Sequence, residues 1–203
     1  MSPFQFLKTI MAKSKVETEP VKKRFFKDPK AKSLTAWILQ ILVVLGLAAL
    51  FSFAFCSSVT IQDTSMDPTL QSGDHVLVNK LVYGLGSISR GDLIAYRTSE
   101  SENSTVHVKR VIGLPGEKIQ IKDGLILING ETYMEDKQFP SIENAGLAAN
   151  TISLGTNEYF VLGDSRNNSE DSRFADVGNI IRSKIIGKVW FITVPSSRIS
   201  FVN

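Results

Sequence analysis

IQIKDGLILING, the stretch from Ile119 to Gly130, decides how the larger part of this chain folds. Two runs rich in isoleucine and leucine flank Asp123-Gly124, and Asn129-Gly130 directly follows the second run. Asp-Gly and Asn-Gly suit the tight turns of β-hairpins, because both residues of such a pair tolerate positive φ. The stretch therefore predicts a β-hairpin with a second turn immediately after it.

Shorter β-type runs precede this hairpin and extend the same pattern towards the N-terminus. They cover Val76 to Leu81, Leu93 to Tyr96 and Val106 to Ile112, and helical spacing is rare beyond Ser57. We therefore expect residues 57–203 to form a mainly β domain built on an antiparallel sheet. The polar, weakly patterned segment 132–156 predicts long loops or a small excursion from the main sheet.

A long apolar run lies before the β-rich part. From Leu34 to Cys56 the chain reads LTAWILQILVVLGLAALFSFAFC, 23 residues without a charge. A helix of that length reaches roughly 34 Å, slightly more than the ~30 Å hydrocarbon core of a bilayer. We expect a transmembrane helix over 34–56, with a buried helix of a soluble protein as the alternative. A cleaved signal usually has shorter basic and apolar parts, which favours a retained anchor.

The basic residues gather at the N-terminus. Residues 1–33 hold nine Lys or Arg against three acidic residues, whereas the whole chain has a net charge of +3. The positive-inside rule then predicts a cytoplasmic tail over 1–33 and an extracytoplasmic domain over 57–203. A basic tail can also bind nucleic acid, but its position beside a membrane span favours contact with lipid headgroups, and we expect no nucleic-acid partner.

Few residues are suited to metal or cofactor binding. The chain has one cysteine, Cys56, and two histidines, His75 and His107. This composition excludes an internal disulfide framework and disfavours a zinc site, and no glycine-rich phosphate loop or dinucleotide fingerprint occurs. We therefore expect neither a metal nor an organic cofactor.

Two polar side chains could together perform nucleophilic catalysis. Ser65 lies in TSMDPTL, a short distance after the apolar run, and Lys109 lies in the β-type run VHVKRVIG. A lysine that points into an apolar site has a lowered pKa, and its neutral amine can take the proton of a serine. The simpler alternatives are a serine in an ordinary turn and a solvated lysine on a strand.

Four stretches in this order and spacing resemble the bacterial type I signal peptidases, which are membrane-bound endopeptidases with a Ser/Lys pair. They are SMDPTL, RGDLIAYR, KRVIGLPGE and GDSRNNSEDSR, beginning at Ser65, Arg90, Lys109 and Gly163. The resemblance implies that Ser65 is the nucleophile, Lys109 the general base, and Ser169 the residue that orients the lysine amine. It also implies that four charged residues pair with one another and brace the site, namely Arg110, Asp164, Asp171 and Arg173. The alternative is that these residues form a surface ion-pair network.

The resemblance further implies that the chain removes signal peptides from exported preproteins at the outer surface of the membrane. The substrate would bind extended along a strand edge, with small residues at the first and third positions before the cut. The sequence does not identify the substrate-binding residues. A self-processing Ser/Lys peptidase similar to the SOS repressors and an inactive membrane-tethered binding module are alternatives. A His107-based mechanism lacks an orienting carboxylate nearby in sequence.

Two residues depart from the pattern of the family. Ser165 occupies a position that is often Asn, and Asp63 stands two residues before the nucleophile, where relatives have Ser or Gly. An ionised Asp63 would repel the oxyanion of the transition state, so we expect its side chain to turn away from Ser65. The oxyanion would then be held by the Ser65 N–H and a second donor, for which the Thr64 hydroxyl is a candidate.

Overall fold

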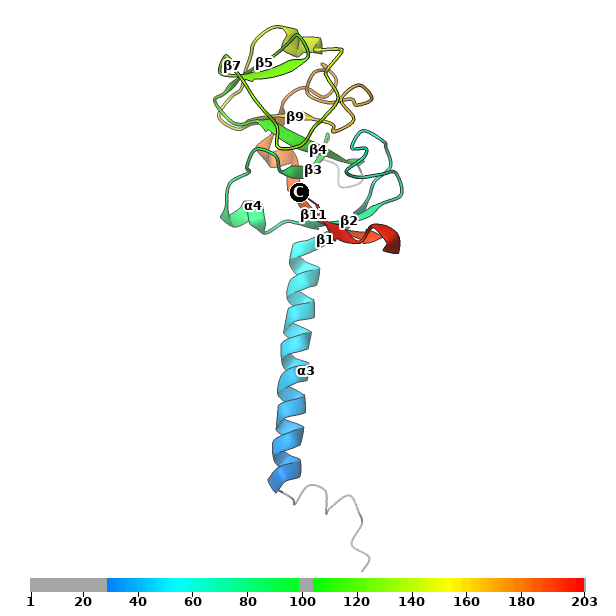
Figure 1. The fold of residues 1–203 in the computed structure, drawn as a ribbon. Helices are drawn as coiled ribbons and strands as arrows, with labels where there is room; N and C mark the ends of the chain where they lie inside the picture. Colours follow the sequence, from blue (N-terminus) through cyan, green and yellow to red (C-terminus); the bar gives the residue numbers. More distant parts are fainter. Residues whose placement is uncertain (1–28, 99–103, 203) are drawn as a thin grey trace, which may run out of the picture. The chain divides into compact units, whose positions relative to one another are not determined.

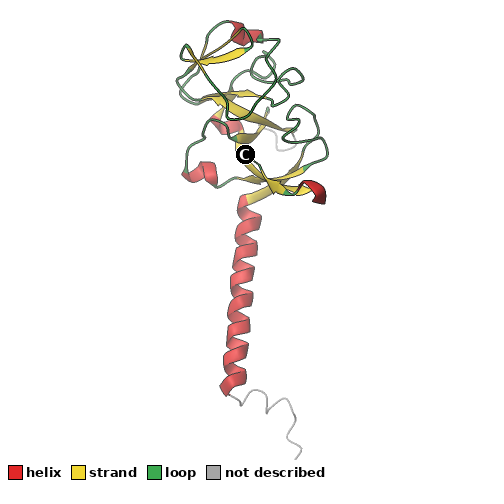
Figure 2. Ribbon diagram, viewed as in Figure 1, coloured by secondary structure: helices red, strands yellow, loops and turns green. Residues whose placement is uncertain are grey.

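The computed structural model describes residues 29–98 and 104–202 (Figures 1 and 2). The described residues divide into two compact units, with the boundary between Ser52 and Phe53.

The apolar run forms the helix α3 (Pro29–Phe55). The helix begins five residues before the start of the expected span and ends one residue before the end of that span, where strand β1 starts. Proline suits the first turn of a helix, where its missing N–H would have no partner. Within α3, the window Ser33–Leu50 is long and apolar enough to cross a bilayer, and none of it is buried within the protein.

An antiparallel sheet forms the centre of the second unit, in the order β1-β2-β11-β3-β4-β9-β10, with β12 paired to β11. Its strands are β1 (Cys56–Thr60), β2 (His75–Asn79), β3 (Leu93–Arg97), β4 (Val106–Gly113), β9 (Glu158–Leu162), β10 (Ile180–Ile181), β11 (Ile185–Val194) and β12 (Ser200–Phe201). The short helix α4 (Val82–Leu85) follows β2. Strand β11 thus pairs with both β2 and β3 (Figure 1). The expected mainly β architecture is confirmed.

A smaller sheet has the order β7-β6-β5-β8. It consists of β5 (Lys118–Lys122), β6 (Leu125–Ile128), β7 (Glu131–Thr132) and β8 (Ile152–Ser153). The predicted hairpin is confirmed, and both turns have positive φ throughout, at 52° and 77° for Asp123-Gly124 and 54° and 89° for Asn129-Gly130. The excursion from the main sheet therefore begins at Lys118 rather than near Thr132, because the hairpin itself belongs to the smaller sheet. Its loop segment also contains the 3₁₀ turn Gly146–Ala149.

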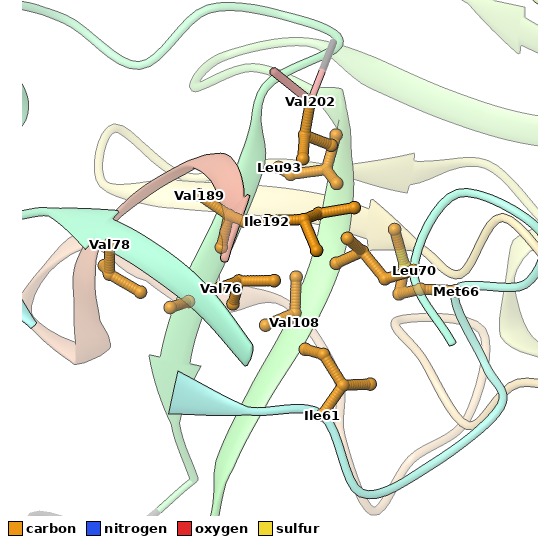
Figure 3. Packing of buried hydrophobic residues seen from close by; sticks show 11 residues of the cluster. Ile61, Met66, Leu70, Val76, Val78, Leu93, Val108, Val189, Ile192 and Val202 are labelled. Atoms are coloured by element: carbon orange, nitrogen blue, oxygen red, sulfur yellow. The ribbon is translucent and has the colours of Figure 1, made fainter. Parts of the chain in front are cut away.

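The main sheet packs on both of its faces. Val108 belongs to one hydrophobic cluster with Met66, Leu70 and Val76 (Figure 3), whereas Val111 belongs to another cluster with residues of β3 and β9. Successive side chains of a strand point to opposite faces, so a lysine at position 109 is directed to the face of Val111 and not into the first cluster. This alternation determines the environment of the candidate base.

Candidate active site

Ser65 lies in the loop between β1 and β2, and its neighbours hold it in place. Met66 and Leu70 are completely buried in the hydrophobic cluster that Figure 3 shows. The backbone forms a helical turn there, because the N–H of Leu70 donates to the carbonyl of Met66 at 3.0 Å. Burial of two large apolar side chains on this turn stabilises it by several kcal/mol, on the order of 2 kcal/mol each. Ser65 itself is 5% exposed.

Lys109 lies in the middle of β4, opposite Ile94 of β3, and is 2% exposed. Its Nζ is within hydrogen-bonding distance of the Ser65 Oγ. Burial lowers the pKa of Lys109, because the protein interior disfavours its ammonium form, while Asp63, Asp171 and Glu170 oppose this effect. The structure thus brings together the two residues that sequence reasoning selected from separate stretches.

Asp63 does not lie where we expected it. Its Oδ1 accepts hydrogen bonds from the Ser65 Oγ at 2.7 Å and from the Ser65 N–H at 3.1 Å. The expectation that the side chain turns away from the nucleophile is therefore wrong, because the carboxylate finds two donors and a nearby lysine there. Partial burial acts to raise the pKa of Asp63, but the hydrogen bonds from Ser65 and the charge of Lys109 hold it below its ordinary value.

Arg110 and Asp164 form a buried, two-pronged ion pair. The Arg110 Nε and Nη2 each lie 2.7 Å from one oxygen of Asp164. The Thr69 hydroxyl donates to the same carboxylate at 2.6 Å. Asp164 therefore connects the loop of Ser65, the strand of Lys109 and the loop that follows β9.

Asp171 and Arg173 form a second buried pair within the loop that follows β9. The Arg173 Nε and Nη2 each lie 2.8 Å from one oxygen of Asp171. Arg173 also donates to the carbonyls of Asn144 and Arg166, at 3.0 and 2.6 Å. The four charged residues do pair, as Arg110 with Asp164 and Arg173 with Asp171, and both pairs are buried rather than part of a surface network.

Ser169 does not make the contact that the resemblance implied. Its Oγ is buried and has no hydrogen-bond partner among the described residues, whereas the Lys109 amine donates to Ser65. Ser169 packs instead over the backbone of Gly163, where an added Cβ would lie 2.2 Å from the Ser169 Oγ. The same Cβ would lie 2.5 Å from the Ser65 carbonyl oxygen, so only glycine allows these segments to meet.

The Ser65 and Lys109 side chains line a cavity of about 420 Å³. Its wall also includes Asp63, Thr64, Tyr96, His107, Ser169 and Glu170. The Ser65 Oγ bonds to Lys109 and Asp63, and among the described residues it has no hydrogen bond to His107. Burial and the charge of Lys109 lower the pKa of His107, whereas His75 does not line the cavity.

The described part of the chain contains no group of three or more His, Cys, Asp or Glu side chains able to hold a metal ion. The arrangement that it does contain is suited to acyl transfer, since it combines a buried hydroxyl, an amine with a lowered pKa and an adjacent cavity. An amine can accept a proton from a hydroxyl only in its neutral form, which the lowered pKa of Lys109 favours.

Sequence reasoning missed Thr69 and Gly163 and misplaced Asp63. Thr69 is the polar residue of SMDPTL beside the buried Leu70, and Gly163 opens the stretch GDSRNNSEDSR. The glycine directly before Asp164 was the available signal for a close backbone approach, because glycine has no Cβ. The contacts themselves join residues about 100 positions apart, which no local pattern reveals.

Comparisons with known proteins show which family the chain resembles. Residues 34–194 match the family described as signal peptidase, peptidase S26. A signal peptidase I of Bacillus licheniformis is 33% identical over 179 residues, covering 84% of this chain and 94% of that relative. A signal peptidase IB of Staphylococcus aureus is 32% identical over 187 residues, covering 84% and 94%. A signal peptidase I crystal structure from Enterococcus faecalis aligns with a TM-score of 0.40 and 27% identity, covering 51% of this chain and 97% of that one.

The family match extends over most of the chain, and both relatives are more than 30% identical along most of their own length. This chain therefore belongs to the signal peptidase family, peptidase S26, a family of serine peptidases.

Proposed function

We propose that this chain cleaves signal peptides from exported preproteins, with Ser65 as the nucleophile and Lys109 as the general base. The observation that carries the proposal is the hydrogen bond between the Lys109 Nζ and the Ser65 Oγ at a buried position beside a cavity. The names of the relatives, signal peptidases I and IB, support the same substrate class. Intact Ser65 and Lys109 argue against an inactive binding module.

In the proposed reaction, neutral Lys109 takes the Ser65 proton while Oγ attacks the scissile carbonyl carbon. The tetrahedral intermediate collapses, the peptide C–N bond breaks, and the lysine ammonium returns its proton to the leaving amine. Water, deprotonated by Lys109, then hydrolyses the acyl-serine ester and releases the signal peptide. The buried pair Arg110–Asp164 holds β4 against the loop of Ser65, which keeps the two reacting groups in register.

The developing oxyanion needs donors beside Ser65. The Ser65 N–H bonds to Asp63 in the resting structure, so the substrate carbonyl must replace the carboxylate at that donor. Thr64 lines the cavity, and its Oγ1 accepts a hydrogen bond from the Asn168 Nδ2 at 2.9 Å. This contact leaves the Thr64 hydroxyl proton available for donation to the oxyanion.

The anchor and its orientation complete the proposal. Helix α3 holds the enzyme in the membrane, the basic residues before it remain in the cytoplasm, and residues 57–203 face outwards. Enzyme and membrane-inserted preprotein then share one plane, which raises their effective concentration, so that modest intrinsic affinity suffices.

The test is cleavage of a preprotein by the detergent-solubilised full chain. Ser65→Ala and Lys109→Ala should each abolish cleavage, whereas the exposed counterparts Ser196→Ala and Lys118→Ala should cleave like the wild type. His107→Ala and His75→Ala should retain most activity. A correctly folded His107→Ala enzyme as inactive as Ser65→Ala would refute the Ser/Lys assignment.

A further inference from the structure

Asp63 makes contacts that a Ser/Lys reaction does not require. A carboxylate accepts hydrogen bonds and a hydroxyl has one proton, so Ser65 donates that proton to Asp63 and accepts from the Lys109 amine. The resting site is therefore a chain of three groups, in which the Lys109 amine donates to the Ser65 hydroxyl and that hydroxyl donates to the Asp63 carboxylate.

A local turn accounts for only part of this arrangement. An aspartate that accepts the N–H two residues ahead forms an ordinary Asx turn, which is the role of the 3.1 Å contact between Asp63 and the Ser65 N–H. The turn does not require the shorter 2.7 Å contact to the Ser65 hydroxyl. This second contact is what couples the carboxylate to the nucleophile.

The charge of Asp63 is also less neutralised than that of Asp171. Lys109 faces three carboxylates, namely Asp63 before the nucleophile and Glu170 and Asp171 after β9, and His107 lies on its own strand. Asp171 is held by both nitrogens of the Arg173 fork. The hydrogen bonds of Asp63 among the described residues go to Ser65 alone, so its charge acts on Lys109 without a competing arginine.

We infer that Asp63 is a positioning residue that holds the resting Ser65 hydroxyl and stabilises the ammonium form of Lys109, and so sets the pH at which the enzyme becomes active. This inference rests on the proposed Ser/Lys function. Activation has two steps: the Lys109 ammonium loses a proton to solvent, and the Ser65 hydroxyl turns from Asp63 to the neutral amine. Asp63 opposes both steps, so it shifts activity towards alkaline pH.

Two substitutions separate the charge from the hydrogen bond. Asp63→Asn removes the charge but retains an amide oxygen as acceptor, whereas Asp63→Ala removes both. We expect the acid limb of kcat/KM to move to lower pH by roughly half to one unit in both variants, at the low end of charge effects because Asp63 is exposed to solvent. Only Asp63→Ala also removes the acceptor that holds the Ser65 hydroxyl away from the neutral amine, so its rate at the alkaline plateau should be at least as high as that of Asp63→Asn.

Two further variants serve as controls for charge. Glu170→Gln makes the same change in charge at the same cavity and should shift the limb less, because Glu170 affects Lys109 less than Asp63 does. Glu131→Gln makes it at an exposed position of β7 in the smaller sheet and should give the wild-type profile. Near-ultraviolet circular dichroism identifies any variant that fails to fold. If Asp63→Ala fails to fold, Asp63→Asn alone suffices to test the effect of the charge.

A second measurement does not depend on cleavage. The full chain in detergent, with ¹³C at the lysine ε-carbons, reports the ionisation of Lys109 by NMR, and Lys109→Arg identifies its signal. The Lys109 titration should move to lower pH in Asp63→Asn. If the wild type cleaves preprotein but its acid limb and its Lys109 titration coincide with those of Asp63→Asn, the inference is wrong and the proposed function stands. If the wild type cleaves nothing, the proposed function fails, and an unchanged titration still overturns the inference.

Discussion

Replacing Asp164 with Asn should destabilise the catalytic domain by about 3–5 kcal/mol. The Asp164 side chain is 0% exposed and that of its partner Arg110 is 6% exposed. Both oxygens of Asp164 accept from Arg110 at 2.7 Å, and one also accepts from Thr69 at 2.6 Å. In the Asn variant an amide NH₂ must face one of these donors, and the Arg110 charge remains buried without its counterion.

The loss should be visible in both unfolding and catalysis. For a domain of this size, each kcal/mol corresponds to about 2–4 °C in Tm, so the predicted fall is roughly 6 to 20 °C. Tryptophan fluorescence of the full chain in detergent can follow the transition, since Trp190 lies in β11. Cleavage should fall as well, because Asp164 joins the Ser65 loop to the strand of Lys109.

A double-mutant cycle makes this prediction specific. Arg110→Gln alone leaves the Asp164 charge buried without its partner. The double variant Arg110→Gln with Asp164→Asn removes both charges. Its loss of unfolding free energy should therefore be well below the sum of the losses in the two single variants. Asp176→Asn, an exposed aspartate near the same loop, should stay within about 0.5 kcal/mol of the wild type. A loss below about 1 kcal/mol in Asp164→Asn, or strictly additive costs, would refute the argument.

Three further predictions concern the site and the anchor. Gly163→Ala should abolish cleavage and lower the unfolding free energy by about 1–3 kcal/mol, since the added Cβ meets Ser169 and Ser65; a folded variant with wild-type kcat/KM contradicts this. Because burial lowers the pKa of Lys109 and only its neutral form is a base, kcat/KM should rise with pH through that lowered value and be lost below it; a pH profile with its maximum in mildly acid solution points to another base. Protease added outside intact cells or spheroplasts should degrade residues 57–203 and spare a tag on Met1, and protection of a C-terminal tag reverses the orientation.

Local signals explain how much of the fold was predictable. The hairpin at Ile119–Gly130 followed from two β-rich runs and two residue pairs that tolerate positive φ, and each of these signals depends on neighbours in sequence. Strand β11 (Ile185–Val194) was not singled out, although it lies between β2 and β3. Strand order results from packing between distant segments, and no local pattern shows which run becomes central.

The candidate site, too, was predictable where local signals exist and not where distant segments meet. Ser65 and Lys109 could be selected because each lies in a distinctive stretch and because a buried lysine is chemically suited to activate a serine. The error at Asp63 arose because the argument considered repulsion of the oxyanion and not the resting state, in which a hydroxyl and an ammonium attract the carboxylate. The packing of Ser169 on Gly163 needs the three-dimensional approach of two loops.

The central position of β11 has a consequence for the order in which the site assembles during folding. The strand pair β1–β2 encloses the loop of Ser65, and the pair β3–β4 carries Lys109. Among the strands of residues 29–98 and 104–202, β11 is the one that joins these two hairpins in the sheet. Each hairpin can form from contacts between neighbouring segments, whereas closure of the sheet must wait for residues 185–194, far along the chain. In the proposed mechanism, the nucleophile and its base are therefore brought together late in folding, when β11 joins the two hairpins.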